Sequence, residues 1–97
     1  SDVYKRQIDM LSAHALNGVI ARGLKTISPF DVSKKGGTTA IVCGDKVDSH
    51  TMEKLLRDRN VIGSGRGEVI RIAPHFYTKP EEIDYALDCI KDILEGR

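Results

Sequence analysis

The sequence predicts an α+β fold, a two-layer sandwich in which a small, mainly antiparallel sheet is covered by helices on one face. Apolar residues recur at helical spacing in three segments, and short apolar segments rich in β-branched residues lie between them. The resulting order is helix, strand, helix, strand, strand, helix. Each predicted helix has a single apolar stripe to bury, so all of them are expected on the same side of the sheet. With 97 residues, the chain has the length of one domain.

The first predicted helix runs from Ile8 to Arg22, where apolar residues repeat every three or four positions. Gly23 stands where a helix end is expected, because glycine readily adopts the left-handed conformation that closes many helices. Residues 1–7 carry little hydrophobic pattern and are interpreted as a leader without functional weight. Residues 26–37 combine proline, glycine, serine and lysine, a composition typical of a connection with turns.

A strand and a second helix are expected next. Residues 38–43 (TTAIVC) are β-branched and apolar, as in a buried strand. Asp48 or Ser49 is a suitable N-cap, because a short oxygen-bearing side chain can accept hydrogen bonds from the first backbone amides of a helix. Asn60 is the expected end of this helix.

The glycine-rich segment 63–67 is expected to connect two strands of a hairpin, residues 61–62 and residues 69–73. Its composition also suggests a phosphate-binding loop. A dinucleotide-binding loop needs a strand before it and a helix after it, and here a strand follows. The pattern therefore favours a flexible hairpin loop.

The last predicted helix has the clearest N-terminal signal. Thr78 and Glu81 match a capping box, with Pro80 in the first turn. Its apolar stripe continues almost to the end of the chain: Ile83, Ala86, Leu87, Ile90, Ile93 and Leu94.

Composition excludes some classes of function. Fifteen basic residues against fourteen acidic ones give a net charge of +1, which argues against a dedicated binder of nucleic acid or of acidic membranes. No apolar run is long enough to span a membrane. The two cysteines, Cys43 and Cys89, are too few for a disulfide framework, so we expect reduced thiols and a cytoplasmic location. Their spacing to His50 and His75 matches no compact metal-ligand pattern, and no metal site is predicted.

Arg71 is the residue that the hydrophobic pattern does not explain. It lies inside the apolar segment 69–73 (VIRIA), where successive side chains point to opposite faces of a sheet. If Ile70 and Ile72 face the helices, Arg71 projects from the other face. An arginine there needs water or an anionic partner. It is therefore either a surface arginine on an open sheet face or the binding residue for an anion such as a carboxylate, which guanidinium pairs with in bidentate fashion.

The segment 69–84 (VIRIAPHFYTKPEEID) resembles a segment near the C-terminus of class V aminotransferase-like enzymes that depend on pyridoxal 5'-phosphate (PLP). This group includes kynureninases, cysteine desulfurases and related aminotransferases. Residues 21–37 (ARGLKTISPFDVSKKGG) resemble the linker that enters the small domain of these enzymes, and residues 48–61 fit the helix and turn between the two segments. The resemblance covers most of residues 20–94. Two positions depart from the family pattern: Thr78 replaces a common asparagine, and Lys34-Lys35 replace arginines.

The resemblance implies that Arg71 binds the α-carboxylate of an amino-acid substrate in a transaminase or kynureninase style of reaction. It also implies that residues 1–25 form a leader and an interdomain-type helix, and that residues 26–97 form the C-terminal small domain of a fold type I PLP enzyme. The residues that hold PLP belong to the large domain in this family, so the chain alone is expected to be inactive and to contain no catalytic residue. The implied partners are a large domain of the same chain and, in the intact enzyme, a second copy in a homodimer.

Two further residues are candidates for the substrate site. Arg66, in the glycine-rich segment, is a possible second contact for an anion. His75 follows the Arg71 segment closely, and it is either a packed histidine at the exit of the strand or a member of the site.

A second hypothesis does not need an enzyme. The element order and the glycine-rich segment also suit a free-standing α+β module that binds an amino acid or regulates another protein. The coding sequence upstream of Ser1 discriminates the two hypotheses: a long reading frame with a PLP-lysine segment favours the enzyme domain, and a nearby start codon favours the module.

Overall fold

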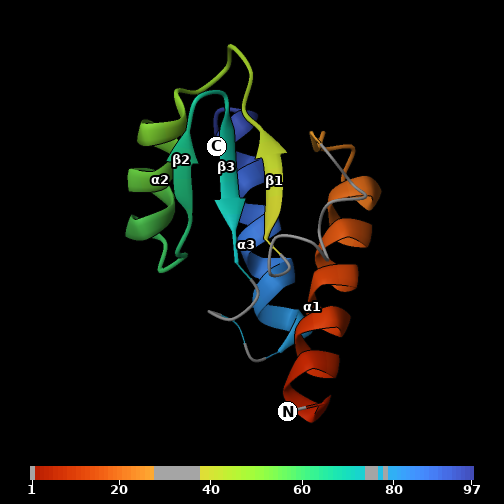
Figure 1. Cartoon of the computed structure of the whole chain (residues 1–97). Helices are drawn as coiled ribbons and strands as arrows, with labels where there is room; N and C mark the ends of the chain where they lie inside the picture. The colour runs from red at the N-terminus through yellow and green to blue at the C-terminus, as the bar shows by residue number, and fades with distance from the viewer. Residues whose placement is uncertain (1, 28–37, 74–76, 78) are drawn as a thin grey trace.

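A three-stranded antiparallel sheet, flanked by three helices, is the framework of the structure (Figure 1). The computed structural model describes residues 2–27, 38–73, 77 and 79–97. In this part of the chain the order is helix, strand, helix, strand, strand, helix, which confirms the predicted α+β fold. The strand order is β1-β3-β2, and both outer strands run antiparallel to the central β3. The connection between residues 27 and 38, expected to contain turns, lies outside the described residues.

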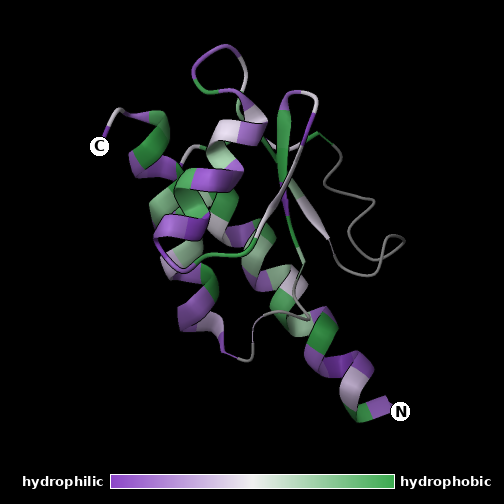
Figure 2. Ribbon diagram, turned by 90° about the vertical axis from the view of Figure 1, so that its left-hand side faces the viewer, coloured by the Kyte–Doolittle hydropathy of each residue, from purple (hydrophilic) through white to green (hydrophobic). Residues whose placement is uncertain are grey.

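Helix α1 (Asp2–Ala21) begins six positions before its predicted start and ends as predicted. Gly23 has a φ of 71°, and the amides of Gly23 and Leu24 donate to the carbonyls of Ile20 and Val19. This is a Schellman-type closure, which glycine permits because it has no Cβ. The early start lies in the exposed part of the helix. In Figures 1 and 2 this part extends away from the rest of the molecule.

Strand β1 (Thr39–Val42) and helix α2 (Ser49–Asp58) match the prediction closely. Asp48 is the N-cap, and its carboxylate accepts hydrogen bonds from the amides of His50 and Thr51. Asn60 follows the helix with a φ of 65°, a conformation that asparagine tolerates better than most residues.

The hairpin differs from the prediction. Strand β2 is Ser64–Arg66, inside the glycine-rich segment expected to be the turn, and residues 61–62 are not a strand. The turn is Gly67-Glu68, and strand β3 is Val69–Ile72. Gly65 explains why this segment forms a strand, since a Cβ at this position would lie 2.2 Å from the carbonyl oxygen of Ser49. Glycine is needed there for the N-terminus of α2 to approach the edge strand.

Helix α3 (Pro80–Leu94) begins one residue later than the predicted cap implies. The N-cap is Lys79, whose amide donates to Oε1 of Glu82 at 3.0 Å. Glu82, and not Glu81, is thus the residue that reaches back to the cap. Lysine has no acceptor with which to complete a capping box. Thr78, the predicted cap, lies outside the described residues.

The core lies between the sheet and the helices. Figure 2 shows hydrophobic residues, in green, both in the strands of the sheet and in the helices beside it. The side chains of Thr39, Ile41, Ile70 and Ile72 point into it, and all four residues are buried. The helices contribute most of the remaining core: Leu11, Ala15, Val19, Met52, Leu56, Ile83, Ala86, Leu87 and Ile90. This agrees with the expectation that Ile70 and Ile72 face the helices.

Candidate functional site

The sheet face opposite the helix-covered core contains Arg71. The register of the strands defines the composition of this face. Arg71 lies directly across from Ala40 on β1 and from Ser64 on β2. One step along the sheet, Val69 lies across from Val42 and Arg66. Residues directly opposite each other in an antiparallel pair point to the same side. We call the surface formed by these six residues (Ala40, Val42, Ser64, Arg66, Val69 and Arg71) the outer face.

Arg71 as a residue is partly buried, and its Nε atom is fully buried. No hydrogen-bond partner reaches this Nε within the described part of the structure. A buried donor without a partner normally costs a protein about 1–3 kcal/mol. Asp84, a nearby acid in sequence that could have neutralised Arg71, instead pairs with His14 and Arg22. Arg71 thus has a buried donor without an acceptor among the described residues.

Small cross-strand neighbours flank Arg71 on both sides. Ala40 has only a methyl group and Ser64 only a hydroxymethyl group, and neither residue is fully buried. Long side chains at these positions would fill the space beside the guanidinium, because directly opposed side chains in a sheet are in contact. Short side chains therefore stand on both sides of Arg71.

Arg66 and His75 are the two further candidates for the substrate site, and the structure describes only the first of them. Arg66 is exposed on the outer face, diagonal to Arg71 across the β2–β3 pair. The register therefore places these two arginines on the same face of the sheet, and their role in binding an anion stays a prediction. His75 lies outside the described residues, and its relation to Arg71 stays a prediction.

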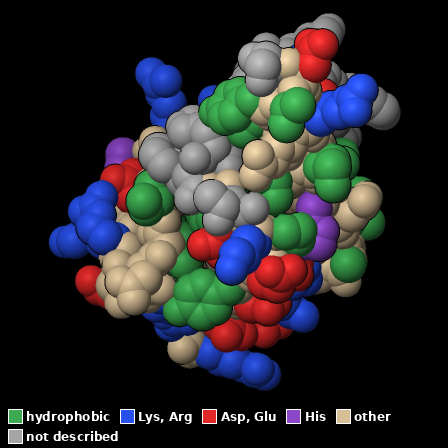
Figure 3. Space-filling model, turned by 90° about the horizontal axis from the view of Figure 1, so that it is seen from below, with side chains coloured by type: hydrophobic (Ala, Val, Ile, Leu, Met, Phe, Trp, Pro, Cys, Tyr) green, Lys and Arg blue, Asp and Glu red, His purple; other side chains and the backbone are tan. Residues whose placement is uncertain are grey.

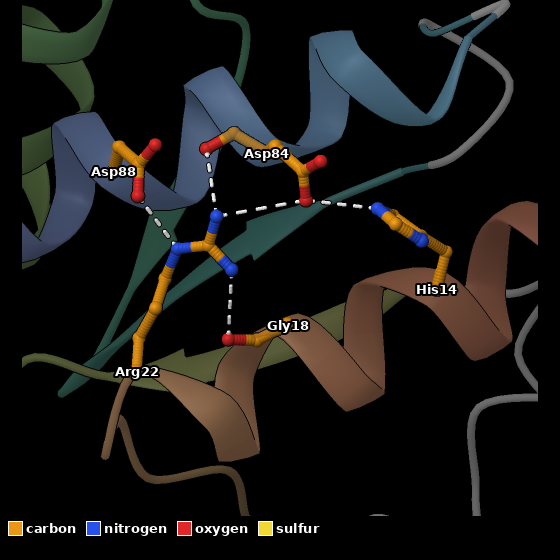
Figure 4. Close-up of polar contacts among 5 residues, drawn as sticks. All are labelled: His14, Gly18, Arg22, Asp84 and Asp88. Carbon is orange, nitrogen blue, oxygen red and sulfur yellow. Dashed lines mark hydrogen bonds and ion pairs between the residues drawn. The ribbon is translucent and has the colours of Figure 1, made fainter.

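A polar cluster between α1 and α3 was missed from the sequence. Figure 4 shows Arg22 at the end of α1 reaching two acidic residues of α3. Its Nε donates to Asp88 at 2.7 Å, and its terminal nitrogen lies 3.5 Å from Asp84. His14 Nε2 lies 2.8 Å from the same Asp84 carboxylate. The sequence itself offers no recognisable partner set for His14. Its only signal was the position of Asp84 and Asp88 one turn apart on a helix, which places both carboxylates on one side.

This cluster is best explained as a connection between helices. Its two basic side chains, Arg22 and His14, already pair with its two carboxylates, and Arg22 also donates to the backbone carbonyl of Gly18. Gly18 brings the helices close together, since a Cβ there would lie 2.6 Å from Leu87 Cδ1. Among the described residues, no donor of this cluster is buried without a hydrogen-bond partner, whereas the Arg71 Nε is.

Two buried groups have raised pKa values. Burial raises the pKa of the Cys43 thiol, with a further contribution from the negative charge of Asp48. Cys43 and Cys89 are both free and buried, as expected of reduced structural thiols. Burial also raises the pKa of Tyr77 to about 12, and the Tyr77 hydroxyl donates to the carbonyl of Ile62 at 2.9 Å. Neither group is activated as a nucleophile or base near neutral pH.

Two hollows among the described residues lie away from Arg71. One, of about 450 Å³, is lined by the ends of α1, β1 and α3 and contains Arg22, Lys25, Lys46 and Lys91. Lysines near helix C-termini complement the helix dipole, so their presence there does not require an anionic ligand. Another, of about 310 Å³, is lined by Tyr77, Tyr85 and two glutamates of α3.

The remaining surface carries mixed charge. On the face seen from below, acidic and basic side chains are interspersed with hydrophobic ones (Figure 3). In the described ranges, no group of histidine, cysteine, aspartate and glutamate side chains gathers in a way that could ligate a metal ion. No described helix is long and apolar enough to cross a membrane.

Comparisons with known proteins do not place the chain in a family. No family model matches it, and no curated protein matches it.

Proposed function

We propose that this chain is the C-terminal small domain of a PLP-dependent enzyme of the class V aminotransferase group. In this proposal Arg71 binds the α-carboxylate of an amino-acid substrate. The observation that carries the proposal is the buried Nε of Arg71, which has no partner among the described residues and lies on the outer face. The resemblance of residues 69–84 to the C-terminal segment of these enzymes supplies the enzyme group.

The proposed role of Arg71 is to position the substrate. Two parallel N–H donors of a guanidinium match the two oxygens of a carboxylate, so the pair fixes both the place and the orientation of the substrate. Fixing a reactant in this way removes a large part of the entropic barrier of a reaction between two molecules. The central strand suits the task because β3 is hydrogen-bonded on both sides and cannot easily shift.

The cofactor is assigned to another domain. Arg71 suits a carboxylate. Lys46 and Lys54 are both exposed, which fits solvated surface charges and not a lysine bonded to PLP. When bound in the intact enzyme, PLP serves as the electron sink for negative charge at the substrate α-carbon. The contribution of this chain is to bind the carboxylate and to cover one side of the substrate.

The test is a conservative substitution in the full-length protein that contains this chain together with a large domain. Arg71→Lys keeps the charge but removes the two-pronged donor. We expect the KM for the amino-acid substrate to rise at least roughly tenfold, the effect of losing about 1.4 kcal/mol of binding. The visible absorbance of the bound cofactor should not change, because Arg71 is not assigned to it.

Lys54→Arg on the exposed side of α2 is the matched control, and it should leave the KM and turnover unchanged. An Arg71→Lys enzyme with the KM and turnover of the parent would remove the basis of the proposal. The same is true if the reading frame upstream of Ser1 encodes no PLP-binding domain, in which case the free-standing module is the better explanation.

A further inference from the structure

We infer that the outer face recognises a ligand with two anionic groups, of which an acidic amino acid with a second carboxylate is the simplest. This inference rests on the proposed function and extends it, because it assigns the second carboxylate to Arg66. The α-carboxylate stays with Arg71.

The register of the hairpin places the two arginines. Arg71 is opposite Ser64, and Arg66 lies two residues further along the same strand, opposite Val69. Both side chains project from the outer face as diagonal neighbours, a relation in which the backbones are roughly 7–8 Å apart and long side chains can meet the same ligand. The intervening positions on this face hold Ser64, which is exposed, and Val69, which is buried, and neither side chain is charged.

The charges on this face are unbalanced. None of its six residues is acidic, so two like charges lie on one small surface. Glu68 is the nearest acid along the chain, but it lies in the turn, and in the described part of the structure it forms no ion pair with Arg66. Two acids of α3, Asp84 and Asp88, pair with His14 and Arg22 in the α1–α3 cluster.

Two like charges on neighbouring positions of a sheet repel each other. A ligand with one carboxylate neutralises one guanidinium and leaves the other uncompensated. A ligand with two carboxylates neutralises both, and each contact is a charge-assisted hydrogen bond. The second contact therefore adds affinity as well as a preference for acidic side chains. Ser64, between the arginines, offers a further hydroxyl donor.

The experiment is a nuclear magnetic resonance titration of the 97-residue chain with L-glutamate and with L-norvaline. These two amino acids have the same number of carbon atoms and differ in the second carboxylate. We expect glutamate to bind roughly tenfold more tightly than norvaline, with shifts concentrated on β2 and β3. Arg66→Gln should abolish this preference and leave norvaline binding unchanged, and Lys54→Gln, which removes a charge elsewhere, should leave both unchanged.

The outcomes separate this inference from the proposed function. Equal binding of both amino acids, lost in Arg71→Gln, would overturn the role of Arg66 and leave the carboxylate-binding role of Arg71 intact. Binding that is insensitive to Arg71→Gln, or no binding of either amino acid, would overturn both. An equal loss of glutamate binding in Arg66→Gln and Lys54→Gln would show general charge attraction, which contradicts a site.

Discussion

Arg22 and Arg71 are both partly buried arginines, but their surroundings differ. Arg22 donates to Asp88 and to the carbonyl of Gly18, and its side chain is 18% exposed. Arg71 has a buried Nε without a partner in the described structure. A residue retained at a cost to stability is commonly a functional one, whereas a paired residue contributes to the fold. We therefore expect substitutions of the two arginines to change the free energy of unfolding in opposite directions.

Arg71→Met should leave the free energy of unfolding unchanged or raise it by up to about 1 kcal/mol. Methionine keeps much of the apolar stem, and the substitution removes a buried donor that has no acceptor. Arg22→Met should lower the free energy of unfolding by about 1 kcal/mol, a modest effect because its acidic partners are largely exposed. Urea denaturation of both variants measures the difference. If Arg71→Met destabilises the protein as much as Arg22→Met does, Arg71 has a structural role.

Tyr77 predicts a specific dependence of stability on pH. Burial raises its pKa from 10.0 to about 12, so the folded protein holds the phenolic proton more tightly than the unfolded chain does. Below pH 10 the neutral Tyr77 makes its full contribution to the free energy of unfolding. As the pH rises from 10 towards about 12 this contribution is lost, and the total loss is about 3 kcal/mol. Tyr77→Phe should lose about 1 kcal/mol at neutral pH, because it lacks the hydrogen bond to Ile62.

The phenylalanine variant should then become more stable than the parent above about pH 11, where the tyrosine penalty exceeds the lost hydrogen bond. Denaturation curves of both proteins from pH 8 to about pH 12 test this, since other groups titrate equally in the two proteins. Parallel stability curves over this range would contradict a buried, neutral Tyr77.

At the scale of single residues, an unusual side chain could be identified from the sequence, but the partners of a side chain could not. Arg71 stood out because a charge interrupts an apolar alternation, and the register then showed its small neighbours. The partners of His14 could not be predicted. Asp84 is 70 positions away in the sequence, and only the packing of α1 on α3 brings the two together.

At the scale of elements, the helices were predictable and the hairpin was not. Helices were predictable because their signals lie close together in the sequence. These signals are the helical spacing of apolar residues and the caps Asp48 and Gly23. Strand β2 has no such signal, because glycine in a strand normally indicates a bulge or a turn. Its position is fixed by the close approach of α2, a contact between segments that the sequence does not encode locally.

Gly65 supplies the test of that explanation. Gly65→Ala should destabilise the protein by about 2–3 kcal/mol, because the new methyl group would overlap the backbone of Ser49 and push α2 from the sheet edge. Gly67→Ala is the matched control. It has a φ of 60° but no atom within 4 Å of the added Cβ, so it should cost only about 1 kcal/mol of backbone strain. Equal costs for the two variants would show that backbone conformation, and not the contact with α2, requires glycine in β2.

The whole molecule combines a helix-covered core with a face that carries unbalanced charge. Helices α2 and α3 and the second half of α1 bury their apolar stripes against one side of the sheet. The other side presents two arginines on a sheet only three strands wide. Stability and the proposed recognition of a carboxylate are thus assigned to opposite faces of the same strands. Substitutions on the outer face should accordingly change binding more than folding.

We predict that the first half of α1 contributes nothing to this core. Residues 2–7 are exposed, and the first buried side chain of the helix is Leu11. Removal of residues 1–7 should therefore change the free energy of unfolding by less than about 0.5 kcal/mol. Leu11→Ala, in contrast, should cost about 2–4 kcal/mol, because it leaves a cavity between α1 and the rest of the core. Thermal and urea denaturation of the two variants measures both effects. A loss of more than about 1 kcal/mol in the shortened chain would show that the exposed half of α1 stabilises the domain, and the interpretation of these residues as a leader would then be wrong.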